Sequence, residues 1–296
     1  MALKEYSTMV QQRINDFMQS RLQSLDDWAP ELKEALSYGL LLGGKRSRPL
    51  LVYATGQALG QKLELLDSAA AGIECVHAYS LIHDDMPEMD GDVLRRGRPT
   101  VHVKFSQQTA LLAGDALQAL GFEFLSSNTA LPPEIIAKQT LILAREAGYS
   151  GMCGGQAMDL KAEHQHIPYE TLRVLHSKKT GALIKAAVQL GAVAAGASEE
   201  AMQALTLYAQ KTGLAFQIWD DVLDVTGDSA VTGKPVGNDE AAGKSTYPAL
   251  FGLEKAKELA HEACAAAQEA LKAPALDTAD TTMLTEFAAF CVERDH

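Results

Sequence analysis

An all-α fold is predicted by two features of the sequence. Ala, Leu, Gln, Glu and Lys recur at spacings of three and four residues, and these residue types favour helices. Runs in which β-branched and polar residues alternate, as they do in strands, are nearly absent. Short breaks rich in Gly and Pro separate the helical segments, and no low-complexity linker divides the chain. We therefore expect residues 1–296 to form a single large helical domain of about ten or more helices.

The composition is that of a globular protein with a strongly acidic balance. Of the 296 residues, 47% are apolar, which is enough to build a sizeable core. The formal net charge of −12 gives the chain no electrostatic reason to bind nucleic acid or an anionic membrane. The longest apolar stretch, residues 183–197, contains Lys185 and Gln189 and does not predict stable membrane insertion. Because we find neither a signal peptide nor paired cysteines, we expect a reduced, cytoplasmic protein.

The segment from Ala69 to Asp85 is mostly apolar but carries polar residues on one face. Glu74, His77, Ser80 and Asp84 follow one another at intervals of three, three and four residues. Those intervals align the four side chains along one side of a helix. A polar stripe on an otherwise apolar helix lines either water or a ligand cavity. His77 alone would fit an ordinary core position, and its alignment with Asp84 is what makes it a candidate ligand.

A second segment, from Thr206 to Asp224, repeats this design. Its polar stripe consists of Gln210, Gly213, Gln217, Asp220 and Asp224. Asp220 and Asp224 are one turn apart, and carboxylates so close repel one another unless a cation lies between them. A capped helix end or a solvated face would explain one such pair, but two clusters favour metal binding. Oxygen ligands without Cys or His select hard cations, and Mg²⁺ commonly shares its ligands with substrate phosphates.

Basic residues accompany both acidic clusters, although the chain is acidic overall. Three cations lie between Gly43 and Pro49, and Arg95, Arg96 and Arg98 directly follow the first cluster. Further lysines stand beside glycines or end the loop after the second cluster: Lys178, Lys179, Lys234 and Lys244. Arg binds phosphate oxygens bidentately, whereas Lys acts as a point charge. Each group alone would fit a solvated surface, but together with the carboxylates they predict a diphosphate site.

The ordered set of motifs resembles the trans-isoprenyl diphosphate synthase family, and within it the bacterial farnesyl diphosphate synthases. His83 to Asp90 reads H-D-D-M-P-E-M-D, similar to the first aspartate-rich motif, D-D-x-x-x-x-D. Phe216 to Asp224 resembles the second motif, and residues 233–247 resemble the loop that follows it. Residues 43–49, 154–156 and 179–181 also fit, so the resemblance extends from about Pro30 to Arg294.

This resemblance implies an all-α fold whose helices surround a deep central cavity, usually in a homodimer. It also implies Mg²⁺-dependent, head-to-tail prenyl transfer, in which isopentenyl diphosphate condenses with dimethylallyl or geranyl diphosphate to give farnesyl diphosphate. About three Mg²⁺ ions would bind together with the diphosphate. The chain departs from the family pattern at Gly91 and Val93, where polar residues are common. Because Asp90 and Asp92 remain, metal binding is expected to survive.

The resemblance further implies a role for individual side chains. The metal ligands would be Asp84, Asp90 and Asp220, supported by Asp85, Asp221 and Asp224. The allylic diphosphate would be bound by Arg95, Lys179 and Lys234, with Lys244 as a further donor. Isopentenyl diphosphate would be bound by Lys45, Arg48, His77 and Arg96. The reacting carbons would be faced by Thr180 and Gln217.

Product length in this family depends on bulky side chains that close the cavity just before the first motif. Tyr79 and Ser80 occupy the corresponding positions here. An aromatic residue five positions before Asp84 resembles the bacterial synthases that stop at fifteen carbons. Helical spacing turns Tyr79 about 140° away from Asp84, so an ordinary core tyrosine is the alternative.

Three other interpretations follow from the same residues. A geranylgeranyl or longer-chain synthase uses the same chemistry. A terpene cyclase also ionises an allylic diphosphate at an aspartate cluster, but it would usually lack the second cluster. It would also need no isopentenyl site, so Lys45, Arg48 and His77 argue against it. A regulatory subunit of such a synthase would tend to lose one aspartate motif, whereas both are intact here.

Overall fold

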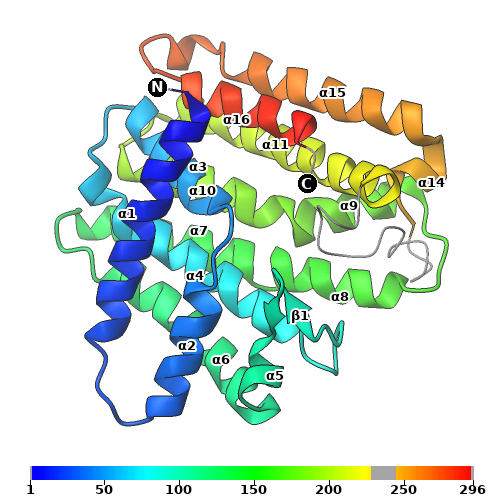
Figure 1. Cartoon of the computed structure of the whole chain (residues 1–296). Coiled ribbons are helices and arrows are strands. Elements are labelled where there is room, and N and C mark those ends of the chain that lie inside the picture. The colour runs from blue at the N-terminus through cyan, green and yellow to red at the C-terminus, as the bar shows by residue number, and fades with distance from the viewer. Residues whose placement is uncertain (1, 228–244, 295–296) are drawn as a thin grey trace. The chain divides into compact units, whose positions relative to one another are not determined.

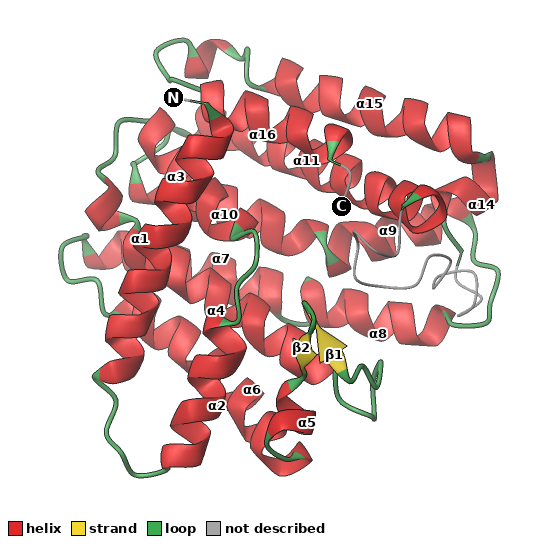
Figure 2. Cartoon of the chain, viewed as in Figure 1, coloured by secondary structure: helices red, strands yellow, loops and turns green. Residues whose placement is uncertain are grey.

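The computed structural model describes residues 2–227 and 245–294, and this part of the chain is almost wholly helical (Figures 1 and 2). The all-α prediction and the expectation of ten or more helices are therefore confirmed. The chain forms two compact units. The first comprises residues 1–53 and 62–140, and the second comprises residues 54–61 and 141–296. The single-domain assignment stays a prediction.

The first unit is built around α4 (Asp67–Asp84), which is buried along most of its length. The other helices of this unit are α1 (Leu3–Gln23), α2 (Pro30–Leu41), α5 (Val101–Lys104) and α6 (Gln107–Ser126), with a short 3-10 turn η1 (Leu63–Leu65). Their ends follow local rules. Pro30 stands at the start of α2, where its missing N–H costs nothing, and the Ser106 side chain caps α6 by accepting from Thr109 N.

The second unit is centred on α11 (Glu199–Thr226), the 28-residue helix that carries the second aspartate motif. Its other helices are α8 (Met152–Ala162), α9 (Tyr169–Lys179), α10 (Gly181–Ala194), α14 (Tyr247–Phe251), α15 (Leu253–Ala270), η2 (Pro274–Leu276) and α16 (Thr282–Glu293). Helices α15 and α16 pack along α11 (orange, red and yellow in Figure 1). Two further helices, α3 (Ser47–Ala58) and α7 (Pro133–Ala147), begin in the first unit and end in the second. Within the described residues, none of the helices combines the length and apolarity needed to span a bilayer.

A two-stranded hairpin interrupts the helical pattern after the first aspartate motif (Figure 2). Strand β1 (Leu94–Arg95) pairs antiparallel with β2 (Arg98–Pro99). The two residues between the strands, Arg96 and Gly97, both have positive φ angles, 54° and 72°. That backbone matches the tight turns that join twisted strands. We predicted only a basic cluster here, because strands of two residues are too short to show alternation.

The crossing of α4 and α6 brings the two backbones into direct contact. A Cβ added at Gly72 of α4 would lie 2.7 Å from the carbonyl oxygen of Gly121 on α6. One added at Gly121 would lie 2.8 Å from the carbonyl oxygen of Gly72. Real Cβ atoms do not approach oxygen so closely, so glycine is required at both positions. The position of α4, and with it the first aspartate motif, is thus fixed by a backbone contact.

The variant Gly72→Ala is expected to lower the free energy of unfolding by about 1–3 kcal/mol, because the added methyl group must push the helices apart. Urea denaturation followed by circular dichroism would measure this change. Ala119→Ser, on an exposed position of α6, is the matched control and should stay within about 0.5 kcal/mol of the starting protein. Equal stability of the two variants would contradict the close contact.

Candidate functional site

The first aspartate motif follows the C-terminal end of α4, where the chain turns back on itself. Asp90 N donates to Asp84 O at 2.9 Å, and Gly91 N donates to Met86 O at 3.0 Å. This turn brings Asp90 beside Asp84 although they are six positions apart in sequence. Asp84 is half-buried and Asp90 is exposed. The motif therefore places the carboxylates of Asp84 and Asp90 together at one end of the first unit.

Asp85, the second carboxylate of this motif, is only 2% exposed and is held by Arg95. Arg95 Nε lies 2.9 Å from both carboxylate oxygens of Asp85, and Nη2 lies 2.6 Å from Oδ1. Because Arg95 belongs to β1, this ion pair fixes the hairpin to the end of α4. Asp85 thus supports the motif from within the fold, and Arg95, predicted to bind diphosphate, is brought next to the acidic cluster.

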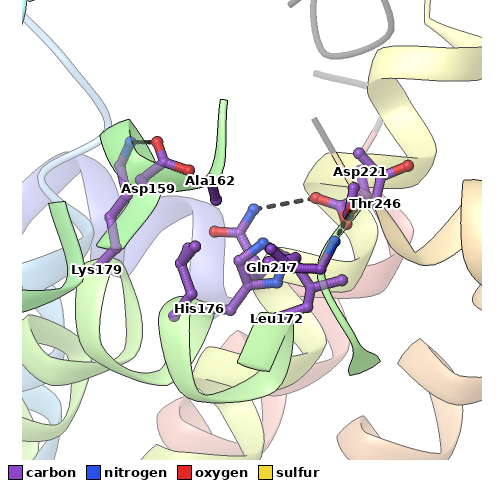
Figure 3. Close-up of a pocket in the computed structure, with 11 residues that line it drawn as sticks. Asp159, Ala162, Leu172, His176, Lys179, Gln217, Asp221 and Thr246 are labelled. Carbon is purple, nitrogen blue, oxygen red and sulfur yellow. Dashed lines mark hydrogen bonds and ion pairs between the residues drawn. The ribbon is translucent and has the colours of Figure 1, made fainter. Parts of the chain in front are cut away.

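In the second motif, as in the first, the second of two adjacent aspartates is buried and held by hydrogen bonds. Asp221 is 2% exposed, and both of its oxygens accept hydrogen bonds. Gln217 Nε2 donates to Asp221 Oδ1 at 3.1 Å (Figure 3). Tyr247 N donates to Asp221 Oδ2 at 3.0 Å. Thr180 Oγ1 in turn donates to Gln217 Oε1 at 2.7 Å. This chain of hydrogen bonds fixes the orientation of the Gln217 amide, so the two residues predicted to face the reacting carbons lie together.

Lys179 lines a pocket of the second unit with Gln217 and Asp221 (Figure 3). Its ammonium is bound by Asp159 of α8, with Nζ 2.6 Å from Oδ2. The approach of the two helices depends on Gly155, because a Cβ there would lie 2.2 Å from Lys179 N. The remaining pocket residues are Ala162, Ile167, Leu172, Leu175, His176, Ser245 and Thr246. Gly155, within residues 154–156 noted in the sequence, therefore allows α8 to pack closely against α9 at Lys179.

Asp220, the first carboxylate of the second motif, pairs with Arg294 near the end of the chain. Arg294 Nη2 lies 2.5 Å from Asp220 Oδ1, and its guanidinium lies 4.0 Å above the Phe216 ring. Trp219 Nε1 donates to the main-chain oxygen of Arg294 at 3.0 Å. Asp224 is half-buried one turn further along α11. The carboxylate of Asp220 is therefore bound to a cation of the chain itself, the guanidinium of Arg294.

Two of the residues predicted to bind isopentenyl diphosphate, Arg48 and Arg96, lie near His77 in the first unit. Burial lowers the pKa of His77 well below its ordinary value, and the nearby positive charges of Arg48 and Arg96 lower it further. Arg96 donates from Nη1 to the carbonyl oxygen of Gly43, which fixes it to the loop before α3. Lys45 of the same loop is exposed. A neutral histidine among cations in an acidic protein is a setting that attracts an anion.

The polar stripe of α4 needs one correction. Glu74 does not line water or a cavity, because it is 3% exposed and its Oε1 accepts from Arg46 Nη1 at 2.7 Å. Helical spacing identified the shared face of Glu74 and His77 but gave no information about a partner 28 residues away. Ser80 is half-buried and donates to His77 O at 2.9 Å.

Tyr79 faces the side of α4 that packs on α6. It is 6% exposed, and its ring lies edge-on to His83 with centroids 5.8 Å apart. His83 Nε2 in turn lies 3.1 Å from the carbonyl oxygen of Leu111 on α6. This position suits both interpretations of Tyr79, as a cavity-closing residue and as a core residue.

Three residues of the site did not emerge from the sequence. Asp159 lies four residues after Gly155, and that spacing on one helix face is the signal that could have revealed it. Tyr247 acts through its main-chain N–H, and Arg294 lies 74 residues from Asp220, so neither leaves a local signal. Lys234 and Lys244, both predicted to bind diphosphate, lie outside the described residues.

Comparison with known proteins identifies relatives along most of the chain. Residues 29–279 match the polyprenyl synthetase family. A farnesyl diphosphate synthase of Escherichia coli is 51% identical over 267 residues, which make up 88% of this chain and 89% of the relative. One of Haemophilus influenzae is 50% identical over 275 residues, or 91% of this chain and 92% of the relative. The apo crystal structure of an FPP/GFPP synthase from Zymomonas mobilis superposes with a TM-score of 0.86 at 38% identity, covering 98% of both chains.

The lowered pKa of His77 makes a prediction about stability against pH. The unfolded chain takes up a proton as the pH falls through about 6.5, whereas the folded protein keeps His77 neutral to much lower pH. Stability is therefore expected to fall below pH 6.5, with a slope approaching about 1.4 kcal/mol per pH unit for this one group. His77→Gln should remove that part of the slope. Denaturation curves at several pH values between 5 and 8 would measure it, and identical slopes for both proteins would refute the assignment.

Proposed function

Because the chain belongs to the polyprenyl synthetase family, whose members are prenyltransferases that elongate prenyl chains, we propose that it is a farnesyl diphosphate synthase. It condenses isopentenyl diphosphate with dimethylallyl and then geranyl diphosphate, releasing diphosphate at each step. The observation that carries this proposal is that one chain contains both intact aspartate motifs and, near His77, the cations Arg48 and Arg96. Identity of about half to two farnesyl diphosphate synthases, over about nine-tenths of the chain, supports the choice of product.

Dependence on a divalent metal is a family property, and we propose Mg²⁺, as about three ions. Asp84 and Asp90 hold it in the first motif, and Asp220 and Asp224 hold it in the second. Among the described residues, no group of three or more His, Cys, Asp or Glu side chains is placed to hold a metal ion by itself. Few ligands, all of them oxygen, suit Mg²⁺, which keeps several waters and shares phosphate oxygens. When bound, it neutralises the diphosphate and makes it a better leaving group. Asp85 and Asp221 do not hold the metal directly. Asp85 positions Arg95 through their ion pair, and Asp221 positions Gln217 through a hydrogen bond.

In the first unit, Lys45, Arg48, His77 and Arg96 bind the diphosphate of isopentenyl diphosphate. The cations supply charge, and the neutral His77 supplies a directional N–H donor. Binding this diphosphate positions the isopentenyl double bond for attack, which converts a bimolecular step into an oriented one. Because this substrate keeps its diphosphate throughout the reaction, its subsite needs fixed cations rather than a leaving-group site.

In the second unit, Lys179 binds the allylic diphosphate, a role that the family resemblance also gives to Arg95 and Lys234. Asp159 positions the Lys179 ammonium through their ion pair. As the C–O bond breaks, these cations stabilise the charge that builds on the departing diphosphate. The dipoles of Thr180 and Gln217 stabilise the allylic cation without trapping it, because neither group is an anionic nucleophile. The isopentenyl double bond then attacks, and the proton released passes to the departing diphosphate.

The rival interpretations have less support. A terpene cyclase has no use for the cationic cluster of the first unit, and a regulatory subunit has no use for two intact motifs. A geranylgeranyl synthase shares every residue discussed and differs in how the cavity closes near Tyr79 and Ser80. The homodimer and the cytoplasmic location stay predictions from the sequence.

Incubating the purified protein with Mg²⁺, isopentenyl diphosphate and dimethylallyl or geranyl diphosphate is expected to yield farnesol after phosphatase treatment, identified by mass. Chelating the metal with EDTA should abolish the product, and restoring Mg²⁺ should recover it. Geranylgeraniol as the main product would replace the farnesyl assignment by the longer-chain one. No condensation with both substrates and Mg²⁺ present would overturn the proposed function.

Tyr79→Ala is expected to lengthen the product beyond fifteen carbons, because it removes the aromatic ring proposed to close the cavity. Mass spectrometry of the dephosphorylated products would detect the change. Phe124→Ala is the control, since Phe124 is a buried aromatic residue of α6 and lies outside the proposed cavity floor. It should destabilise the protein by about 3–5 kcal/mol without changing product length. An unchanged product spectrum for Tyr79→Ala would leave the ordinary core tyrosine as the correct interpretation.

A further inference from the structure

Three cations lie between the end of α2 and the first turn of α3, and they differ in exposure. Lys45 is exposed and Arg48 is half-buried, whereas Arg46 between them is 4% exposed. Arg46 also has a φ angle of +50°, in the left-handed region that non-glycine residues rarely adopt. Burying a charge and holding a non-glycine residue at positive φ both cost free energy, so the contacts of Arg46 must offset that cost or serve a function. Its neighbours, Lys45 and Arg48, belong to the proposed isopentenyl diphosphate subsite.

Arg46 uses its fork of donors to join three helices of the first unit. Nη1 donates to Glu74 Oε1 on α4 at 2.7 Å, and Nε donates to Asn15 Oδ1 on α1 at 3.0 Å. Nη2 donates to the carbonyl oxygen of Leu40 at 2.9 Å, in the last turn of α2, where carbonyls lack helical partners. A single planar guanidinium can serve all three directions, which a lysine cannot do.

The rest of the loop is tied to the same framework. Gln11 Nε2, one turn before Asn15 on α1, donates to the carbonyl oxygen of Lys45 at 3.1 Å. Arg96 donates to the carbonyl oxygen of Gly43. Glu74 precedes His77 by three residues on one face of α4, so the ion pair with Arg46 anchors the loop to the helix that carries His77. The loop is therefore held on both sides of Lys45.

Stability alone does not account for this ion pair. Removing two charges from water costs more than their attraction usually returns, and apolar pairs of similar size are often as stable. The second carboxylate oxygen of Glu74 is buried and has no hydrogen-bond partner among the described residues, which adds to the cost. The ion pair therefore costs the folded state free energy, while its geometry fixes the loop that carries Lys45 and leads into the first turn of α3, where Arg48 lies.

We propose that the buried Arg46–Glu74 ion pair is a positioning device, which orients Lys45 and Arg48 toward His77 so that the subsite for a non-reacting diphosphate exists before the ligand binds. Arg46 and Glu74 do not touch substrate. This inference rests on the proposed function and names two residues on which that function's isopentenyl subsite depends.

The test separates positioning from stability with the double variant Arg46→Met/Glu74→Leu, which replaces the pair by apolar side chains of similar size. Each single change should lower the melting temperature by about 5–10 °C, whereas the double variant should return to within about 3 °C of the wild type. Its Kd for isopentenyl diphosphate, measured by titration calorimetry without allylic substrate, should nevertheless rise about tenfold or more. The KM for isopentenyl diphosphate should rise in parallel, and the KM for geranyl diphosphate should stay within about twofold.

The matched control is the ion pair Arg13–Asp67, which also joins α1 to α4, with Arg13 Nε 2.7 Å from Asp67 Oδ1. Arg13→Met should lower the melting temperature and leave the Kd unchanged. A double variant that recovers both stability and wild-type Kd would overturn the inference, because the pair would then serve only folding. Failure of the wild-type chain to condense its substrates would count against the proposed function alone, since the calorimetric titration requires no turnover.

Discussion

Neutralisation of buried charge is the constraint on which the site depends. Three carboxylates, those of Glu74, Asp85 and Asp221, are only 2–3% exposed, and each meets a donor inside its own unit. A buried carboxylate without such a donor would cost several kcal/mol or would take up a proton. In both aspartate motifs the buried carboxylate is the second of two adjacent aspartates. Since neighbouring helical residues point about 100° apart, fixing the second aspartate also fixes the direction of the first.

Charge in this protein is organised locally and not by the overall balance. The chain has a net charge of −12, yet the surroundings of His77 are positive enough to lower the pKa of His77 beyond the effect of burial. Four arginines contribute to that field, and two of them, Arg46 and Arg95, are largely balanced by carboxylates. Arg46 is paired with Glu74 and Arg95 with Asp85, and Arg48 and Arg96 add further positive charge near His77. Such a division lets one small region combine rigidity with affinity.

Much of the fold could be predicted from the sequence, because residues that favour helices recur at spacings of three and four and because Gly and Pro mark the breaks between helices. Helices α2 and α11 end within two residues of a glycine, Gly43 and Gly227, whereas α4 ends at Asp84, six residues before the break at Asp90-Gly91. The aspartate and lysine motifs were found in the same way, since each is short and continuous. What could not be predicted is the choice of partner across long sequence separations. Arg46 and Glu74 are 28 residues apart, and Lys179 and Asp159 are 20 apart, so no local pattern links them.

The glycine contact between α4 and α6 has a consequence for how such a protein can diversify. Backbone touches backbone at Gly72, seven residues before Tyr79 on the same helix, so the register of α4 does not depend on the size of side chains nearby. Substitutions at Tyr79 and Ser80 can therefore reshape one end of the helix without shifting the aspartates at its terminus. The glycine contact thus lets the residues proposed to set product length vary while the aspartates proposed to hold the metal keep their place.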